Sequence, residues 1–99
     1  MAASDLSGTA REREGAFDHL IKRRDRQQLG VVLRGIRKAA GVSQGDLATR
    51  LGVAQSVLSK IEAGHREVTV LELRVICAAL GVALADVMRN FEDQLSDGQ

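Results

Sequence analysis

Four polar side chains that carry no negative charge share one face of a short predicted helix. They are Gln55, Ser56, Ser59 and Lys60, spaced at one and four residues, which places them side by side on a helix surface. A glutamine amide suits adenine N6 and N7, and a lysine ammonium suits guanine O6 and N7 or a phosphate. Serine hydroxyls donate and accept hydrogen bonds. The chemistry this face offers is hydrogen bonding to the base edges and phosphates of DNA.

Two short helices joined by a tight turn must position this face. Ser43 is expected to cap the first helix, with Asp46 three residues later as a capping-box-like partner. Gly52 ends that helix at a point where the turn needs a positive φ. Ala48 is small enough to let the two helices cross steeply, and the second helix covers 55–63. The pattern predicts a helix-turn-helix.

The opposite side of the second helix is expected to face the protein interior. Val53, Leu58 and Ile61 should anchor the helix against the first helix and the core. The same periodicity turns Glu62 inward, so the outward face lacks an acidic residue. That face is therefore electrostatically compatible with a polyanion.

Three further segments carry apolar residues at three- and four-residue spacing. They span 27–40, 70–80 and 83–95, and Thr69 with Glu72 forms a capping box before the second of them. The chain is rich in good helix formers and has no Pro, Trp or Tyr, which favours helix over sheet. We therefore expect an all-α fold of five helices in one domain, because 99 residues rarely make two.

Composition excludes several classes of function. Cys77 is the only cysteine, so no intrachain disulfide is possible and a reducing, cytoplasmic setting is expected. Cys77, His19 and His65 are too few ligands for a zinc site. The sequence shows no signal peptide and no bilayer-spanning apolar run. It also lacks a catalytic triad in a recognisable context and a glycine-rich phosphate loop. We expect no enzyme activity, no cofactor and no metal.

Charge is unevenly distributed along the chain, although the net charge is only +1. Residues 22–66 hold ten basic and three acidic residues, whereas both flanking segments are net acidic. A basic middle suits one face for phosphates and other faces for water or protein.

The N-terminal segment leaves several interpretations open. Residues 1–10 are small and polar and should be disordered, and residues 11–26 should form a basic helix or arm. The basic run 22–26 could be a solvated helix face, an arm that reaches the DNA backbone, or part of a dimer surface. An apolar cluster within 11–26 is expected to pack against the domain. Its members are Phe17, Leu20 and Ile21.

The central residues resemble the phage-repressor (Cro-like) helix-turn-helix family, also called the xenobiotic-response-element family. The resemblance covers about 27–90 and is carried by spacing as well as residue type. The matching residues are Leu33-Arg34, Arg37, Gly41-Val42-Ser43-Gln44, Asp46-Leu47-Ala48, Leu51-Gly52-Val53, Gln55-Ser56, Leu58-Ser59-Lys60-Ile61-Glu62, Gly64, Leu73, Ala79-Leu80-Gly81-Val82 and Asp86-Val87-Met88. It implies a compact five-helix, lambda-repressor-like DNA-binding domain that is usually dimeric, here over 27–95, with a frayed end at 96–99.

The resemblance also implies roles for individual residues. Gln44 would contact a phosphate and brace Gln55, while Gln55 and Ser56 would meet bases and Ser59 and Lys60 would continue the contact face. Arg37 and Glu62 occupy the positions of a buried ion pair. Ala54 departs from the pattern, because a Ser or Thr usually caps the second helix there.

A homodimer on an inverted-repeat operator is the function these features predict. Arg66 is expected to add a contact to phosphate or base. The apolar stripe of the last helix is the expected dimer seam, unless it belongs simply to the core. Two alternatives stay open: an antitoxin or restriction–modification controller with a toxin or other protein partner, and an interaction module that has lost DNA binding. The stripe comprises Val87, Met88, Phe91 and Leu95.

Overall fold

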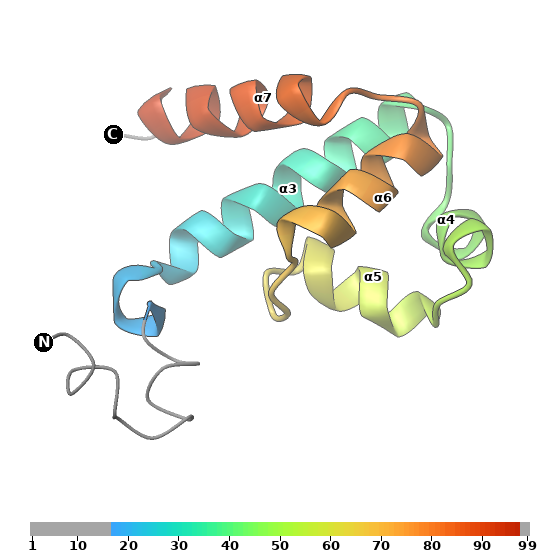
Figure 1. Ribbon diagram of the computed structural model, residues 1–99, viewed down its shortest axis with the longest axis horizontal. Helices are drawn as coiled ribbons and strands as arrows, with labels where there is room; N and C mark the ends of the chain where they lie inside the picture. Colours follow the sequence, from blue (N-terminus) through green and yellow to red (C-terminus); the bar gives the residue numbers. More distant parts are fainter. Residues whose placement is uncertain (1–16, 98–99) are drawn as a thin grey trace, which may run out of the picture.

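A computed structural model describes residues 17–97, and helices joined by turns and short loops are the regular structure of this part of the chain (Figure 1). The five-helix, all-α expectation is confirmed, with one extra helical turn in front. The elements are η1 (Asp18–Leu20), α3 (Arg23–Ala39), α4 (Gln44–Leu51), α5 (Gln55–Glu62), α6 (Val70–Leu80) and α7 (Leu84–Asp97). The disorder expected for 1–10, the residues 11–16 of the expected basic segment and the chain end at 98–99 lie outside the described residues.

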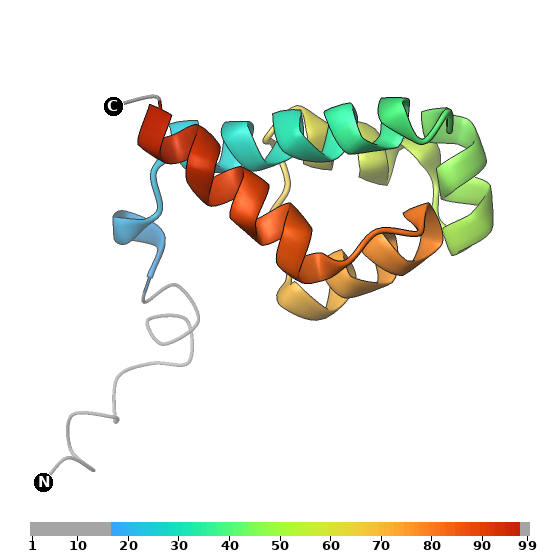
Figure 2. The same cartoon turned by 90° about the horizontal axis from the view of Figure 1, so that it is seen from above.

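The long helix α3 is the axis on which the others are arranged. α3 packs against α7 along one side and against α5 on another. α6 packs against both α4 and α7 (Figures 1 and 2). α3 begins at Arg23, four residues before the expected start, so the basic run 22–26 forms its N-cap and first turn. α7 continues through Asp97, two residues beyond the expected end.

A single apolar core fills the space between these helices. Each helix from α3 to α7 turns an apolar stripe toward this core, because burial of one such stripe per helix is what holds a bundle together. The buried members are Val32, Leu33, Val42, Leu47, Ala48, Leu58, Ile61, Leu73, Ile76, Cys77, Leu80 and Val87. Met88 and Phe91 pack partly buried against this core, which accounts for most of the α7 stripe.

The end of α5 is fixed against the start of α3 by a close approach of two backbones. Gly64 follows α5 in a left-handed conformation, with φ of 78°. A Cβ at this position would lie 2.8 Å from Cα of Gln27. Only glycine meets both demands, so this residue sets how α5 lies on α3.

Two expectations about apolar residues are wrong. Val53 does not anchor α5, because its side chain lies in the turn and is 40% exposed. The cluster of Phe17, Leu20 and Ile21 does not pack against the domain as a whole either, because Phe17 and Leu20 are 70% and 63% exposed. Only Ile21, 43% exposed, lines a hollow with Leu29, Ile61 and Phe91. Since η1 lies beyond the end of the core, its side chains have no interior to enter.

No helix within residues 17–97 combines the length and apolar character needed to cross a bilayer.

Candidate nucleic-acid interface

The helix-turn-helix forms as the local sequence requires. Ser43 caps α4, with its Oγ accepting a hydrogen bond from the backbone N–H of Asp46 at 3.0 Å. Gly52 then takes a left-handed conformation, with φ of 68°. The N–H of Val53 donates to the carbonyl of Ala48 at 3.0 Å and closes the turn. These bonds satisfy backbone groups that a helix end leaves unpaired, so the angle between α4 and α5 is set locally.

The side chains of α5 divide as the periodicity predicted. Leu58 and Ile61 enter the core, with 3% and 4% of their surface exposed. The four polar residues of the outward face are all exposed: Gln55, Ser56, Ser59 and Lys60. Ala54 occupies the N-cap without a side-chain hydrogen bond. The face is thus accessible to a large partner.

A buried ion pair ties α3 to the C-terminal end of α5. Arg37 Nε donates to Glu62 Oε2 at 2.7 Å, and its Nη2 donates to Oε1 at 3.0 Å. The remaining Nη1 donates to the carbonyl of Val42 at 2.8 Å. Both side chains are less than a tenth exposed. The pairing implied by the resemblance is confirmed, and this bidentate geometry satisfies charges that would be costly to bury alone.

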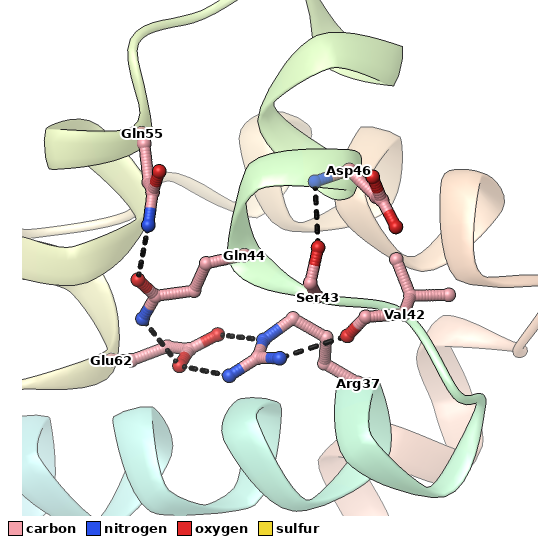
Figure 3. Close-up of polar contacts among 7 residues, drawn as sticks. All are labelled: Arg37, Val42, Ser43, Gln44, Asp46, Gln55 and Glu62. Carbon is pink, nitrogen blue, oxygen red and sulfur yellow. Dashed lines mark hydrogen bonds and ion pairs between the residues drawn. The ribbon is translucent and has the colours of Figure 1, made fainter.

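Gln44 extends this ion pair to the outward face of α5. Its Nε2 donates to Glu62 Oε1 at 2.9 Å, and its Oε1 accepts from Gln55 Nε2 at 3.4 Å (Figure 3). The expected brace between Gln44 and Gln55 is therefore present. Because the carboxylate can only accept, it fixes which end of the Gln44 amide points to Gln55. The carbonyl oxygen of the Gln55 amide stays available.

The electrostatics of Glu62 follow from these neighbours. Burial acts to raise the pKa of its carboxyl group. Hydrogen bonds from Arg37 and Gln44, with the charges of Arg37 and Arg34, outweigh burial and hold the pKa below its usual value. The carboxylate is thus ionised at neutral pH while the face of α5 around it stays free of unpaired negative charge.

Arg66 lies in the loop after α5 and is held by the protein itself. Its guanidinium donates to both carboxylate oxygens of Glu72, at 3.3 and 3.1 Å, and to the carbonyl of Glu67 at 2.9 Å. The hydrogen bonds that Arg66 donates to Glu72 raise the pKa of the Arg66 guanidinium. Glu72 also forms the expected capping box with Thr69. The geometry thus groups Arg66 with the start of α6, apart from the four polar residues of α5.

Arg34 is a neighbour of the interface that the sequence reading did not single out. It is exposed on α3 and lines a polar hollow with Ser43, Gln44 and Ser59. The sequence feature that could have indicated Arg34 is its position three residues before Arg37. This spacing puts both residues on the face of α3 that meets α4 and α5.

Comparison with known proteins agrees with this geometry. The family model described as "Helix-turn-helix" matches residues 33–87. Two crystal structures of the clp gene regulator ClgR from Corynebacterium glutamicum are similar to the chain. One is 36% identical with a TM-score of 0.66, and the match covers 70% of this chain and 88% of that one. The other is 35% identical with a TM-score of 0.69, covering 73% and 77%. A search among curated proteins gives no significant match.

The chain therefore belongs to the helix-turn-helix family of the phage-repressor type, a class of DNA-binding transcriptional regulators. The start of α3 and residues 88–97 of α7 lie outside the segment that the family model matches.

Proposed function

We propose that the chain is a sequence-specific regulator of transcription that inserts α5 into the major groove of double-stranded DNA. The observation that carries this proposal is the exposed polar face of α5, which is held in place by Gln44 and the buried Arg37–Glu62 pair. Gln55, Ser56 and Lys60 would contact base edges, because a helix in the groove presents such side chains to them. Ser59 continues the same face.

Phosphate contacts would flank these base contacts. Gln44 and Arg34 border the hollow beside Ser59, where an approaching phosphate would meet an amide and a guanidinium. Arg66 is a further candidate from the loop after α5, and it would have to share its guanidinium between Glu72 and the DNA. Such contacts fix the position of the protein on the duplex and do not read its sequence.

Two copies would bind an inverted repeat. A helix-turn-helix dimer spans half-sites about one turn apart, roughly 34–36 Å, and the two-fold symmetry of the protein is then repeated in the operator. ClgR is described as a clp gene regulator, which supports a comparable regulatory role for this chain. The cytoplasm is the proposed setting, because Cys77 is the only cysteine of the sequence.

A second candidate function is that of an antitoxin or of a restriction–modification controller. An antitoxin must bind a toxin as well as its operator. The observation in its favour is the exposed apolar surface of α6, where Leu71 and Val75 are 71% and 56% exposed. An apolar patch of this kind is suited to contact with another protein. Co-purification of a small protein with the chain from its own host would favour this candidate.

Selection of bound duplexes from a random DNA pool tests the main proposal. We expect an enriched inverted repeat and a complex that contains two chains by light scattering. Lys60→Ala should weaken binding to the enriched site by ~1–3 kcal/mol if Lys60 reads a base. Arg89→Ala is a matched control, because Arg89 is an exposed cation on α7, far from α5 in sequence and paired with Asp86. Recovery of no enriched duplex would count against the proposal.

A further inference from the structure

One side of α3 carries only cationic and uncharged polar side chains. They recur at spacings of four, seven and four residues, so they lie within about 60° of one another around the helix axis. Every one of them is exposed. We call this side the α3 ridge, and its members are Arg23, Gln27, Arg34 and Lys38.

The positive charges of the α3 ridge have no acidic neighbour on their own side of the helix. Asp25 is the only acidic residue of α3, and it lies on another side, where it lines a hollow with Phe91 of α7. None of the ion pairs among residues 17–96 involves Arg23, Arg34 or Lys38. The ridge therefore presents positive charge to solvent, which suits contact with a polyanion.

The α3 ridge borders the helix-turn-helix. Gln27 of the ridge lies against Gly64, which directly follows α5. Arg34 lines the polar hollow that also contains Ser59 of α5 and Gln44 of α4. Because the apolar side of α5 is buried in the core, its polar face and the α3 ridge are open to the same large partner.

The length of the α3 ridge suits a DNA strand. Arg23 and Lys38 lie at its two ends, ~22 Å apart along the axis at the 1.5 Å rise per residue of an α-helix. Duplex DNA carries one phosphate on each strand every ~3.4 Å of its axis, so a strand that follows α3 offers phosphates to both ends of the ridge. Guanidinium and ammonium groups bind such phosphates irrespective of the base sequence.

We propose that the α3 ridge is a second DNA-contacting surface, which binds phosphates of the strand that borders the groove entered by α5. The inference rests on the proposed function, because it is the position of the ridge beside α5 that brings it to DNA. It extends the interface beyond the helix-turn-helix, since Arg23 and Gln27 lie outside the segment 33–87 that the family model matches. The ridge adds affinity for any duplex, whereas α5 discriminates between duplexes.

The test is the salt dependence of DNA binding by the full chain, measured on the enriched duplex and on an unrelated duplex of the same length. Arg23→Gln and Lys38→Gln should each reduce the slope of log affinity against log salt concentration by ~0.9 for every bound subunit. Both duplexes should lose affinity by the same factor, because a phosphate contact carries no base information. Both side chains are exposed and glutamine is a good helix former, so circular dichroism should show a native fold.

Arg24→Gln is the matched control. It removes the same charge from the same turn of α3, but Arg24 lines a hollow with Leu95 of α7 and lies 3.6 Å from the carboxylate of Asp25. Its salt slope should equal that of the wild type. The inference is wrong if either Arg23→Gln or Lys38→Gln leaves the slope unchanged, or if Arg24→Gln reduces it equally.

Failure of the inference and failure of the proposed function give different results. A chain that enriches an inverted repeat, but whose salt slope does not depend on the α3 ridge, overturns only the ridge. A chain whose affinity for DNA depends on the ridge, but which enriches no duplex, overturns only the reading of bases by α5. A chain that binds no duplex at any salt concentration overturns both.

Discussion

Gly30 of α3 lies directly against the backbone carbonyl of Glu62 at the end of α5. A Cβ at residue 30 would overlap that carbonyl oxygen and would also come within 2.7 Å of the carbonyl oxygen of Ile61. The two helices therefore meet backbone to backbone. The distance between α5 and α3 depends on residue 30 having no Cβ.

Gly30→Ala should destabilise the fold although alanine is the better helix former. The new methyl group meets backbone atoms, which cannot rotate away, so we expect a loss of about 1–3 kcal/mol or more in the free energy of unfolding. Gly35→Ala is the control in the same helix, because nothing lies within 4 Å of its Cβ position. That change should instead add about 0.5–1 kcal/mol. Urea denaturation measures both, and equal effects of the two changes would contradict the close packing.

Glu62→Ala should cost ~3–5 kcal/mol of stability, because it leaves the buried guanidinium of Arg37 without its partner. Glu67→Ala removes an acidic side chain that is 62% exposed and 4.0 Å from Arg26. It should cost at most about 1 kcal/mol. Thermal and chemical denaturation compare the two, and an unchanged melting temperature for Glu62→Ala would refute the role of the pair.

Stability should fall in acid as Glu62 takes up a proton. Because its pKa is lower in the folded than in the unfolded chain, the ion pair contributes its full stability above the ordinary glutamate pKa. That contribution is lost as the pH falls through the lowered pKa.

Comparison with Glu62→Gln isolates this effect. The stability difference between wild type and Glu62→Gln should be constant from pH 7 to about pH 5 and should shrink below that. Glu72 also has a lowered pKa, owing to Arg66, but it titrates in both proteins and cancels. A difference that does not vary down to pH 3 would show that Glu62 is not the titrating group.

Gln44 and Gln55 should act on DNA as a coupled pair. Because Gln44 Oε1 accepts from Gln55 Nε2, Gln44→Ala frees the Gln55 amide to rotate away from the base contact proposed for it. The double variant should therefore lose less affinity than the two single losses combined, with a coupling of about 0.5 kcal/mol or more.

The coupling is measured from the affinities of four proteins for the enriched duplex: wild type, Gln44→Ala, Gln55→Ala and the double variant. The same cycle with Thr49→Ala in place of Gln44→Ala is the control. The Thr49 hydroxyl donates to the carbonyl of Gly45 and not to Gln55, so these two changes should be additive. Strict additivity for Gln44 and Gln55 would argue that the brace has no part in recognition.

The helix-turn-helix could be predicted from the sequence because each of its features is local. Ser43 and Gly52 act on neighbouring backbone groups, and the inward and outward sides of α5 follow from a period of 3.6 residues. The Arg37–Glu62 pair joins residues 25 positions apart, and only the family resemblance indicated it.

Contacts that depend on the whole fold were less accessible. The exposure of Val53 and of Phe17 reflects where the core ends, which no local period encodes. The ion pair between Arg66 and Glu72 depends on the path of the loop between α5 and α6. The closeness of Gly30 to α5 likewise requires the angle between two helices.

The placement of Gln44 between the ion pair and Gln55 has a consequence for how this protein could acquire a new target site. Exchanging Gln55 would disturb Gln44, which also bonds the buried Arg37–Glu62 pair. A change of base preference at Gln55 therefore costs stability of the protein itself. Among residues 17–96, the side-chain hydrogen bonds involve neither Ser56 nor Lys60. Laboratory selection for altered operators should first yield substitutions at those two positions.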